Sequence, residues 1–439
     1  MKNFAPQNGA RWILPLLALA AAGARADTET WSVHGQATFV EQYHPAFRSP
    51  YAGPNSLDPG SRGNETFDAT LFAGVRLWDG GEAYADPEID QGFGLSDTTG
   101  LAGFSSGEAY KVGSSAPYFR LQRLFFRQTF DLGGDTEGVE ADANQLAGTR
   151  TADHLIVTLG KYSVTDVFDT NTYAHDPKSD FLNWAVIDAG TFDYAADAWG
   201  YSYGITAELT QGAWTWRAGL FDLSRVPNST QLQRGFGQYE LVTEAEKTYK
   251  AWNRPGKIRL LAFLNRGRMG SYRDALDRAA LTHAVPDTAL VRRPASRAGA
   301  SLNIEQALTD NLGAFLRAGM NDGSREAYEF TEINRSIAAG LSLKGAAWLR
   351  PDDTAGIAFV ANALSSAARA YFAAGGIGVL IGDGRLPRYG TEDVIEAIYD
   401  VRLTDGVTAG TDYQFVANPA YNRDRGPVSI LSFRLHMEF

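Results

Sequence analysis

The 439-residue chain contains no cysteine, which excludes a disulfide framework. Its stability must therefore come from a large core or from a closed, hydrogen-bonded structure. Beyond the N-terminus the chain also lacks any apolar run that approaches the roughly 20 residues of a membrane-spanning helix. No P-loop is present, and the 6 histidines show no metal-ligand spacing. No paired nucleophile and base emerges, so the sequence indicates no cofactor, no metal and no enzyme chemistry.

Positive charge is scarce, because 40 Lys and Arg residues face 51 Asp and Glu residues, for a formal net charge of −11. The first 26 residues hold three of the basic residues and no acid. They have the charged start, the apolar stretch (12–23) and the Ala-Arg-Ala ending of a secretory signal peptide. We expect residues 1–26 to be removed, so that residues 27–439 form a single domain of charge −14. A chain this acidic is not expected to bind nucleic acid.

Period-two alternation is what the chain has in abundance. In segments 66–78, 199–209 and 395–403, apolar residues alternate with polar and charged ones, as side chains do across a β-strand. The final segment alternates most clearly, through Leu431, Phe433, Leu435, Met437 and Phe439. Each predicted strand thus has one apolar face and one water-facing face, and the last strand is expected to pair with the first.

A soluble β-sandwich also alternates, but two features favour a transmembrane barrel. Arginines and carboxylates occupy mid-strand positions, and short connections alternate with long ones. Tight turns are predicted at 80–81, 211–212, 309–311 and 404–406, and long loops at 45–64, 92–115, 165–196, 271–295 and 366–390. The pattern predicts an all-β, antiparallel transmembrane barrel of about 16 strands, with about 18 as the alternative. Its turns would be periplasmic and its long loops extracellular.

The polar strand faces predict the lining of a pore. They combine charges of both signs with aromatic groups, which suits neutral, hydroxyl-rich solutes better than phosphate. The predicted pore-lining and sugar-binding residues are Arg76, Glu82, Tyr84, Asp86, Glu88, Asp90, Arg123, Arg127, Arg217 and Arg317. For any one of them, an ordinary solvated charge is the simpler interpretation. Because Pro87 cannot donate to a sheet, the third strand is expected to end near Asp86.

The loop at 165–196 is the longest, and it contains aromatic and apolar residues that are typical of a packed loop. We expect it to fold into the lumen and narrow it; the alternative is an external cap over the barrel mouth. The predicted constriction residues are Asp169, Asn171, Asp176, Asn183 and Trp184. At the opposite end, the polar stretch 134–151 is unusually long for a periplasmic turn.

Several motifs resemble those of the carbohydrate-selective porins. They are VHGQAT (33–38), GEAY (81–84) with PEIDQGFGLS (87–96), FDTN (168–171) with DP (176–177) and FLN (181–183), and DYQFVANP (412–419). The resemblance covers essentially the whole chain after residue 26. It implies a monomeric pore of about 16 strands that passes monosaccharides passively across a Gram-negative outer membrane. It also implies lumen roles for Glu82, Glu88, Asp90, Asp169, Asn171, Asp176 and Asn183, whereas the arginines follow from strand parity alone.

Three hypotheses are therefore compared. The first is a sugar-selective porin, the second is a general or cation-preferring porin on the same barrel, and the third is a plugged barrel with a surface-binding or enzymatic role. The expected partners are small sugars as solutes, outer-membrane lipid and lipopolysaccharide around the barrel, and the barrel-assembly machinery, which would recognise the terminal Phe439. The sequence leaves open whether the barrel is a monomer or a trimer.

Overall fold

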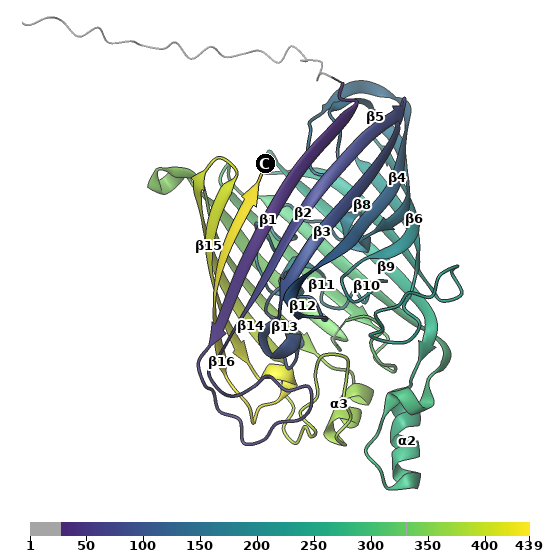
Figure 1. Ribbon diagram of the computed structural model, residues 1–439, viewed down its shortest axis with the longest axis vertical. Coiled ribbons are helices and arrows are strands. Elements are labelled where there is room, and N and C mark those ends of the chain that lie inside the picture. Colours follow the sequence, from purple (N-terminus) through teal and green to yellow (C-terminus); the bar gives the residue numbers. More distant parts are fainter. Residues whose placement is uncertain (1–27, 331) are drawn as a thin grey trace, which may run out of the picture.

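The computed structural model describes residues 28–330 and 332–439, and its strands form one closed antiparallel barrel (Figure 1). Within these residues the barrel has sixteen strands, which confirms the predicted fold and the lower strand count. The first strand, β1 (Trp31–His44), pairs with β2 (Arg62–Trp78) on one side and with the last strand, β16 (Val428–Glu438), on the other. The predicted signal peptide and its cleavage point before Asp27 lie outside the described residues.

Each remaining strand pairs with its neighbours in the sequence. These strands are β3 (Gly81–Gly92), β4 (Ser114–Val139), β5 (Gly148–Tyr162), β6 (Ser202–Gln211), β7 (Trp214–Asp222), β8 (Tyr239–Ala251), β9 (Arg254–Met269), β10 (Arg293–Ala307), β11 (Leu312–Asn321), β12 (Arg335–Gly345), β13 (Arg350–Ala363), β14 (Glu392–Thr404) and β15 (Val407–Ala417). Three α-helices lie in the connections, α1 (Trp184–Ile187), α2 (Tyr272–Thr282) and α3 (Ser366–Ala373). None of the described helices is both long and apolar enough to traverse a lipid bilayer.

The alternation places apolar side chains outside the barrel and polar side chains inside it. On β2, Leu71 and Val75 are each 41% exposed, whereas Asp68 and Thr70, on the opposite face, are buried. Successive side chains of a strand point to opposite faces of the sheet. The pairing register of a strand therefore decides which of its residues face outward and which face the lumen. The apolar residues therefore form the surface that meets lipid, and the polar residues face the lumen.

Short turns gather at the barrel end that carries the C-terminus, called here the turn end, and long loops gather at the other, the loop end (Figure 1). The predicted turns and loops are confirmed to within a few residues. Three further connections lie at the loop end, at 223–238, 322–334 and 418–427, where the sequence pattern did not predict long loops.

The prediction that the third strand ends near Asp86 is wrong. Strand β3 continues through Pro87 to Gly92, so Glu88 and Asp90 are strand residues. The pairing of β3 with β4 shifts register between Asp86 and Pro87, and this irregularity accommodates the missing N–H group of proline. The row from Glu82 to Asp90 therefore stays on the inner face along one continuous strand.

The terminal Phe439 closes the seam between β1 and β16. Its backbone N–H donates to the carbonyl of Gly35 at 2.9 Å, and the N–H of Gly35 donates back to Phe439 at 2.8 Å. The Phe439 ring lies over Gly35, where a β-carbon would come within 2.4 Å of it. Glycine at position 35 thus leaves room for the aromatic ring against the outside of the first strand.

Deleting Phe439 should reduce the fraction of the chain that assembles into a barrel in cells, because it removes two seam hydrogen bonds and the terminal ring. Assembly would be measured as the heat-modifiable band on a semi-native gel. Phe433→Ala is the control, since it removes an outward-facing ring of β16 and leaves both seam bonds intact. A normal heat-modifiable band without Phe439 would contradict the expectation.

Candidate functional site in the barrel lumen

The long connection between β5 and β6, residues 163–201, crosses the inside of the barrel and is called here the crossing loop. It reaches β10, where the Thr172 N–H donates to Glu305 at 2.9 Å, and β14, where the Leu182 N–H donates to Glu396 at 2.6 Å. It also reaches β16, whose Arg434 donates to the carbonyl of Asp180 at 2.8 Å. Strands far around the barrel wall thus hold one loop, which therefore lies inside the lumen and not as a cap above it.

One arginine of β11 organises the crossing loop. The Arg317 guanidinium, 1% exposed, donates to the carbonyl oxygens of Ala174, Val186 and Asp169 at 2.7, 2.8 and 2.9 Å. Its Nε also lies 3.2 Å from the Asp169 carboxylate. Charge-assisted hydrogen bonds are the strongest available to a side chain, so this cluster fixes both limbs of the loop relative to the wall.

Predicted constriction residues Asn171 and Asn183 also hold the loop. Asn171 donates to Asn303 of β10 at 2.8 Å. Asn183 accepts from the Ala185 N–H and so caps the start of α1, while its amide donates to Gln414 of β15. Both residues therefore position the loop and do not face open space.

The short helix α1 places Trp184 between two other loops. Its ring stacks on Phe104, at a centroid distance of 5.2 Å, and on Phe330, at 5.1 Å. Phe104 belongs to the loop after β3, and Phe330 belongs to the loop after β11. All three rings line a cavity of about 540 Å³, which is the candidate solute site.

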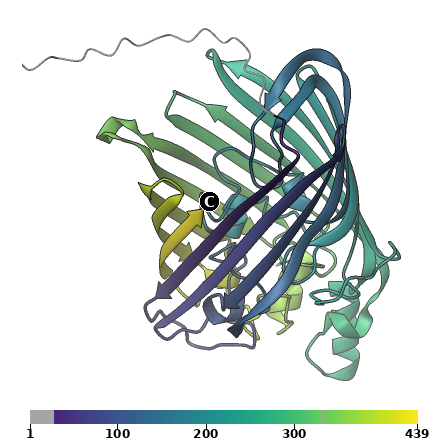
Figure 2. The same ribbon diagram turned by 45° about the horizontal axis from the view of Figure 1, so that its top comes forward.

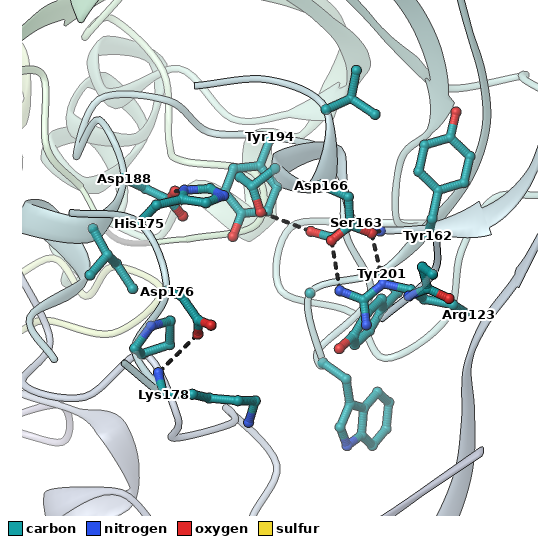
Figure 3. Close-up of a pocket in the computed structure, with 18 of the residues that line it drawn as sticks. Arg123, Tyr162, Ser163, Asp166, His175, Asp176, Lys178, Asp188, Tyr194 and Tyr201 are labelled. Carbon is teal, nitrogen blue, oxygen red and sulfur yellow. Dashed lines mark hydrogen bonds and ion pairs between the residues drawn. The ribbon is translucent and has the colours of Figure 1, made fainter. Parts of the chain in front are cut away.

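Two charged walls face each other across this cavity (Figure 3). On one side, Arg123 of β4 makes a two-pronged contact with Asp166 of the crossing loop, at 2.7 and 2.6 Å. On the other side, the ammonium of Lys178, also in the crossing loop, lies 2.8 Å from the Asp68 carboxylate and 2.6 Å from Glu108. Both of these cations are paired with carboxylates, so this part of the cavity offers hydrogen-bonding groups of both signs.

Aromatic side chains lie beside the arginines of β4. The Arg120 guanidinium lies 3.4 Å from the centroid of Trp199, and the Arg123 guanidinium lies 5.0 Å from that of Tyr201. Trp199, Tyr201 and Tyr162 all line the cavity. The prediction of a strand from residue 199 is wrong at its start, because β6 begins at Ser202 and residues 199–201 belong to the crossing loop.

The structure brings some of the predicted residues to the cavity and places others elsewhere on the lumen wall. Arg123, Arg127, Asp176 and Trp184 line it. Towards the turn end, Arg76 pairs with Glu82 at 2.8 Å, and Tyr84 donates to Glu82 at 2.6 Å.

The other predicted wall residues are engaged with protein partners. Glu88 accepts from Thr70 and Tyr110, and Asp90 lies 3.4 Å from the Gln122 amide. Arg217 lies among Glu208, Glu244 and Glu246, at 2.7 to 3.1 Å.

Sequence reasoning missed several cavity residues, among them Tyr110, Glu108, His175, Lys178, Asp188 and Tyr201. All of them lie in loops, where no strand parity marks the direction of a side chain. The only available signal was the density of aromatic and charged residues in the crossing loop. In the described part of the chain, no group of three or more potential metal ligands is arranged to hold an ion.

The crossing loop contains groups that respond to pH. Burial and the charge of Asp176 raise the pKa of Asp180 to about 6. Burial opposes the positive charge of His175, but the Asp188 carboxylate 3.6 Å away outweighs it, so the pKa of His175 is also raised. For both groups the packed loop favours the protonated form.

A closed sixteen-stranded barrel whose lumen is crossed by a loop defines a porin-type channel. Comparison with family models matches residues 54–439 to the family described as carbohydrate-selective porin, OprB family. The match covers most of the chain. The chain belongs to the carbohydrate-selective porin, OprB family. Members of this family are channel proteins of the outer membrane.

Solved structures share the fold. The high-pH structure of Pseudomonas putida OprB matches with a TM-score of 0.69 at 14% sequence identity, covering 93% of this chain and 94% of that one. The outer-membrane channel DcaP of Acinetobacter baumannii matches with a TM-score of 0.50 at 9% identity, covering 93% and 97% of the two chains. The comparison with curated proteins finds no match.

Replacing Arg317 with methionine should loosen the crossing loop and raise single-channel conductance. Removing one partner of a buried ion pair costs about 3–5 kcal/mol, and here three carbonyl groups also lose their donor. Arg402→Met is the control, since Arg402 pairs at the turn end with the exposed Asp405. Unchanged conductance and unchanged protease resistance of the loop in the Arg317 variant would show that this anchor is dispensable.

Acidification should tighten the crossing loop and lower the conductance and its noise. The pKa of Asp180 is raised to about 6 on packing, so its contribution to loop stability is complete at low pH and is lost as pH rises through about 6. The pKa of His175 is raised above its ordinary value, so its contribution is also present at low pH and is lost as the imidazole loses its proton. The test is single-channel recording between pH 8 and pH 5, with Asp180→Asn expected to flatten the response. A profile that does not change with pH would contradict this account.

Proposed function

We propose that the protein lets small neutral sugars of monosaccharide size diffuse passively across the outer membrane through the lumen cavity. The loop end would face the outside and the turn end the periplasm, as in outer-membrane barrels generally. The family supports a carbohydrate solute, and the geometry supports a neutral one.

The observation that carries the proposal is that Arg123 and Lys178, which lie on opposite sides of the cavity, are each paired with a carboxylate. Arg123 is bound by Asp166, and Lys178 is bound by Asp68 and Glu108. Paired groups still hydrogen-bond to hydroxyls, but they attract a free ion weakly, because each charge is compensated nearby. A phosphate pore would instead present unpaired cations.

The aromatic residues support the same class of solute. Tyr201 and Trp199 lie beside the arginines of β4, while Trp184 lies in the stack with Phe104 and Phe330. Aromatic faces bind the C–H faces of sugar rings, and the neighbouring charged groups bind the hydroxyls at the ring edge. A sugar fits both requirements at once, whereas a small inorganic ion uses only one.

The test is single-channel conductance of the refolded protein, titrated with glucose, a disaccharide, a trisaccharide and salts. Saturable block of the ion current by glucose is expected. Arg123→Ala should weaken that block by roughly tenfold or more, because a charge-assisted hydrogen bond contributes about 1.5–3 kcal/mol. Arg402→Ala, at the turn end, serves as the matched control.

The outcomes separate the competing hypotheses. Openings without sugar block, together with a preference for cations, would favour a general or cation-preferring porin. An absence of openings would favour a plugged barrel with a different role.

A further inference from the structure

The β4–β5 hairpin extends beyond its neighbours at the turn end (Figure 1). The pairing of β3 with β4 stops at Gln128, and the pairing of β6 with β5 stops at His154. Beyond Gln128, β4 has no further pairing with β3, and before His154, β5 has none with β6. The remaining parts of the two strands, which end at Val139 and begin at Gly148, pair only with each other. This part is a two-stranded ribbon that is free to bend away from the wall.

The ribbon contains the features needed to bend. Its register shifts twice, between Asp131 and Gly133 and between Gly133 and Thr136. Gly133 and Gly134 have φ values of 137° and 86°, a region that favours glycine, and bulges at such positions sharpen the curvature of a hairpin. The polar stretch 134–151, predicted as an unusually long turn, is mostly strand, and only residues 140–147, called here the hairpin tip, lie outside the strands.

The hairpin tip returns into the barrel mouth. The Asn144 amide donates to the Asp86 carboxylate of β3 at 2.8 Å, and Arg127 of β4 donates to the Asn144 carbonyl at 2.8 Å. The Leu146 N–H donates to the Tyr84 hydroxyl at 3.2 Å, and the Leu146 side chain is only 2% exposed. These partners are inward-facing wall residues, so the tip lies inside the lumen.

The N-terminal segment and β2 hold the tip in place. The Ala147 N–H donates to the Glu29 carboxylate at 2.8 Å, and the Glu29 N–H donates to the Ala147 carbonyl at 3.0 Å. Arg76 donates to the same carbonyl at 3.2 Å. The position of the tip is therefore specified by several independent contacts, unlike that of a solvated turn.

The tip also forms one end of the solute cavity. Asp142, Ala143, Asn144 and Gln145 line it, together with Arg123 and Arg127 of the wall and Trp184 of the crossing loop. Segments from the loop end and from the turn end thus line the same cavity. The β4–β5 hairpin, in blue, curves at the turn end of the barrel (Figure 2). The tip contributes amide and carboxylate groups and no cation of its own.

We propose that the hairpin tip is a second selectivity element, which limits solute size at the periplasmic exit of the cavity and hydrogen-bonds passing hydroxyl groups. This inference rests on the proposed sugar-channel function and adds to it the residues at the exit. A solute then passes two narrow places, the crossing loop first and the hairpin tip second. The two are built from different connections and can be changed separately.

The first experiment shortens the tip. Because Val139 pairs with Gly148, residues 140–147 can be replaced by Asn-Gly, which closes a two-residue hairpin. We expect higher conductance and a several-fold rise in trisaccharide uptake relative to glucose in liposome swelling. Glu137→Ala, exposed on the ribbon outside the mouth, is the control. An assembled variant with unchanged conductance and size selectivity would overturn the proposal.

A second experiment uses the full-length chain and does not depend on the shortened variant folding. Because the protein has no cysteine, Asn144→Cys carries the only thiol. Labelling with a bulky methanethiosulfonate reagent should reduce conductance in steps, whereas labelling of Thr136→Cys, exposed on the ribbon, should not. Complete labelling at position 144 with no change in current would also overturn the proposal.

The two proposals fail in different ways. If the unmodified protein conducts ions but sugars neither block nor pass, the sugar-channel function fails, while the effect of labelling at position 144 still tests the tip. If sugars pass and neither tip variant alters conductance or size selectivity, only the tip proposal fails.

Discussion

The structure depends on one constraint, that each backbone N–H and C=O group facing lipid has a partner within the protein. Closing the sheet between β1 and β16 meets it, and the terminal Phe439 completes that seam. Because the wall cannot open without losing these bonds, it cannot adjust its width to a solute. Selectivity for solutes must therefore come from segments that are inserted into the lumen. Inward-facing side chains of the wall, which do not contact lipid, hold these segments in place.

Charge pairing inside the barrel serves two purposes. Buried charges are unfavourable unless they are paired and hydrogen-bonded. The buried charge of Arg317 is compensated by Asp169, and that of Arg217 by three glutamates. The same chemistry at Arg123 and Lys178 lies beside a cavity, where the paired groups remain available to hydroxyls. Stability of the loops and preference for neutral solutes thus arise from one arrangement.

The wall could be predicted from sequence because its signal is local. Period two alone places Leu71 outside and Asp68 inside, and it puts Glu82 and Arg123 on the lumen side. Parity does not say where around the circumference a residue lies, so Arg123 and Arg217 looked equivalent although only Arg123 lines the cavity. The contacts of the crossing loop could not be foreseen, because Glu396 and Arg434 become its neighbours only when the sheet closes. The continuation of β3 through Pro87 could not be predicted either, because it depends on a register shift in the pairing of β3 with β4.

The attachment of the crossing loop has a consequence for the order of assembly. Its final partners include β14 and β16, so Asp180 and Arg434 come together across 254 residues of chain. Contacts of such long sequence separation form late, after the entropy of closing the intervening chain has been lost. The contacts of the loop with β16 therefore form after those with Arg317 of β11, which do not need the last strand. The attachment of the crossing loop is complete only when the C-terminal strand has joined the barrel.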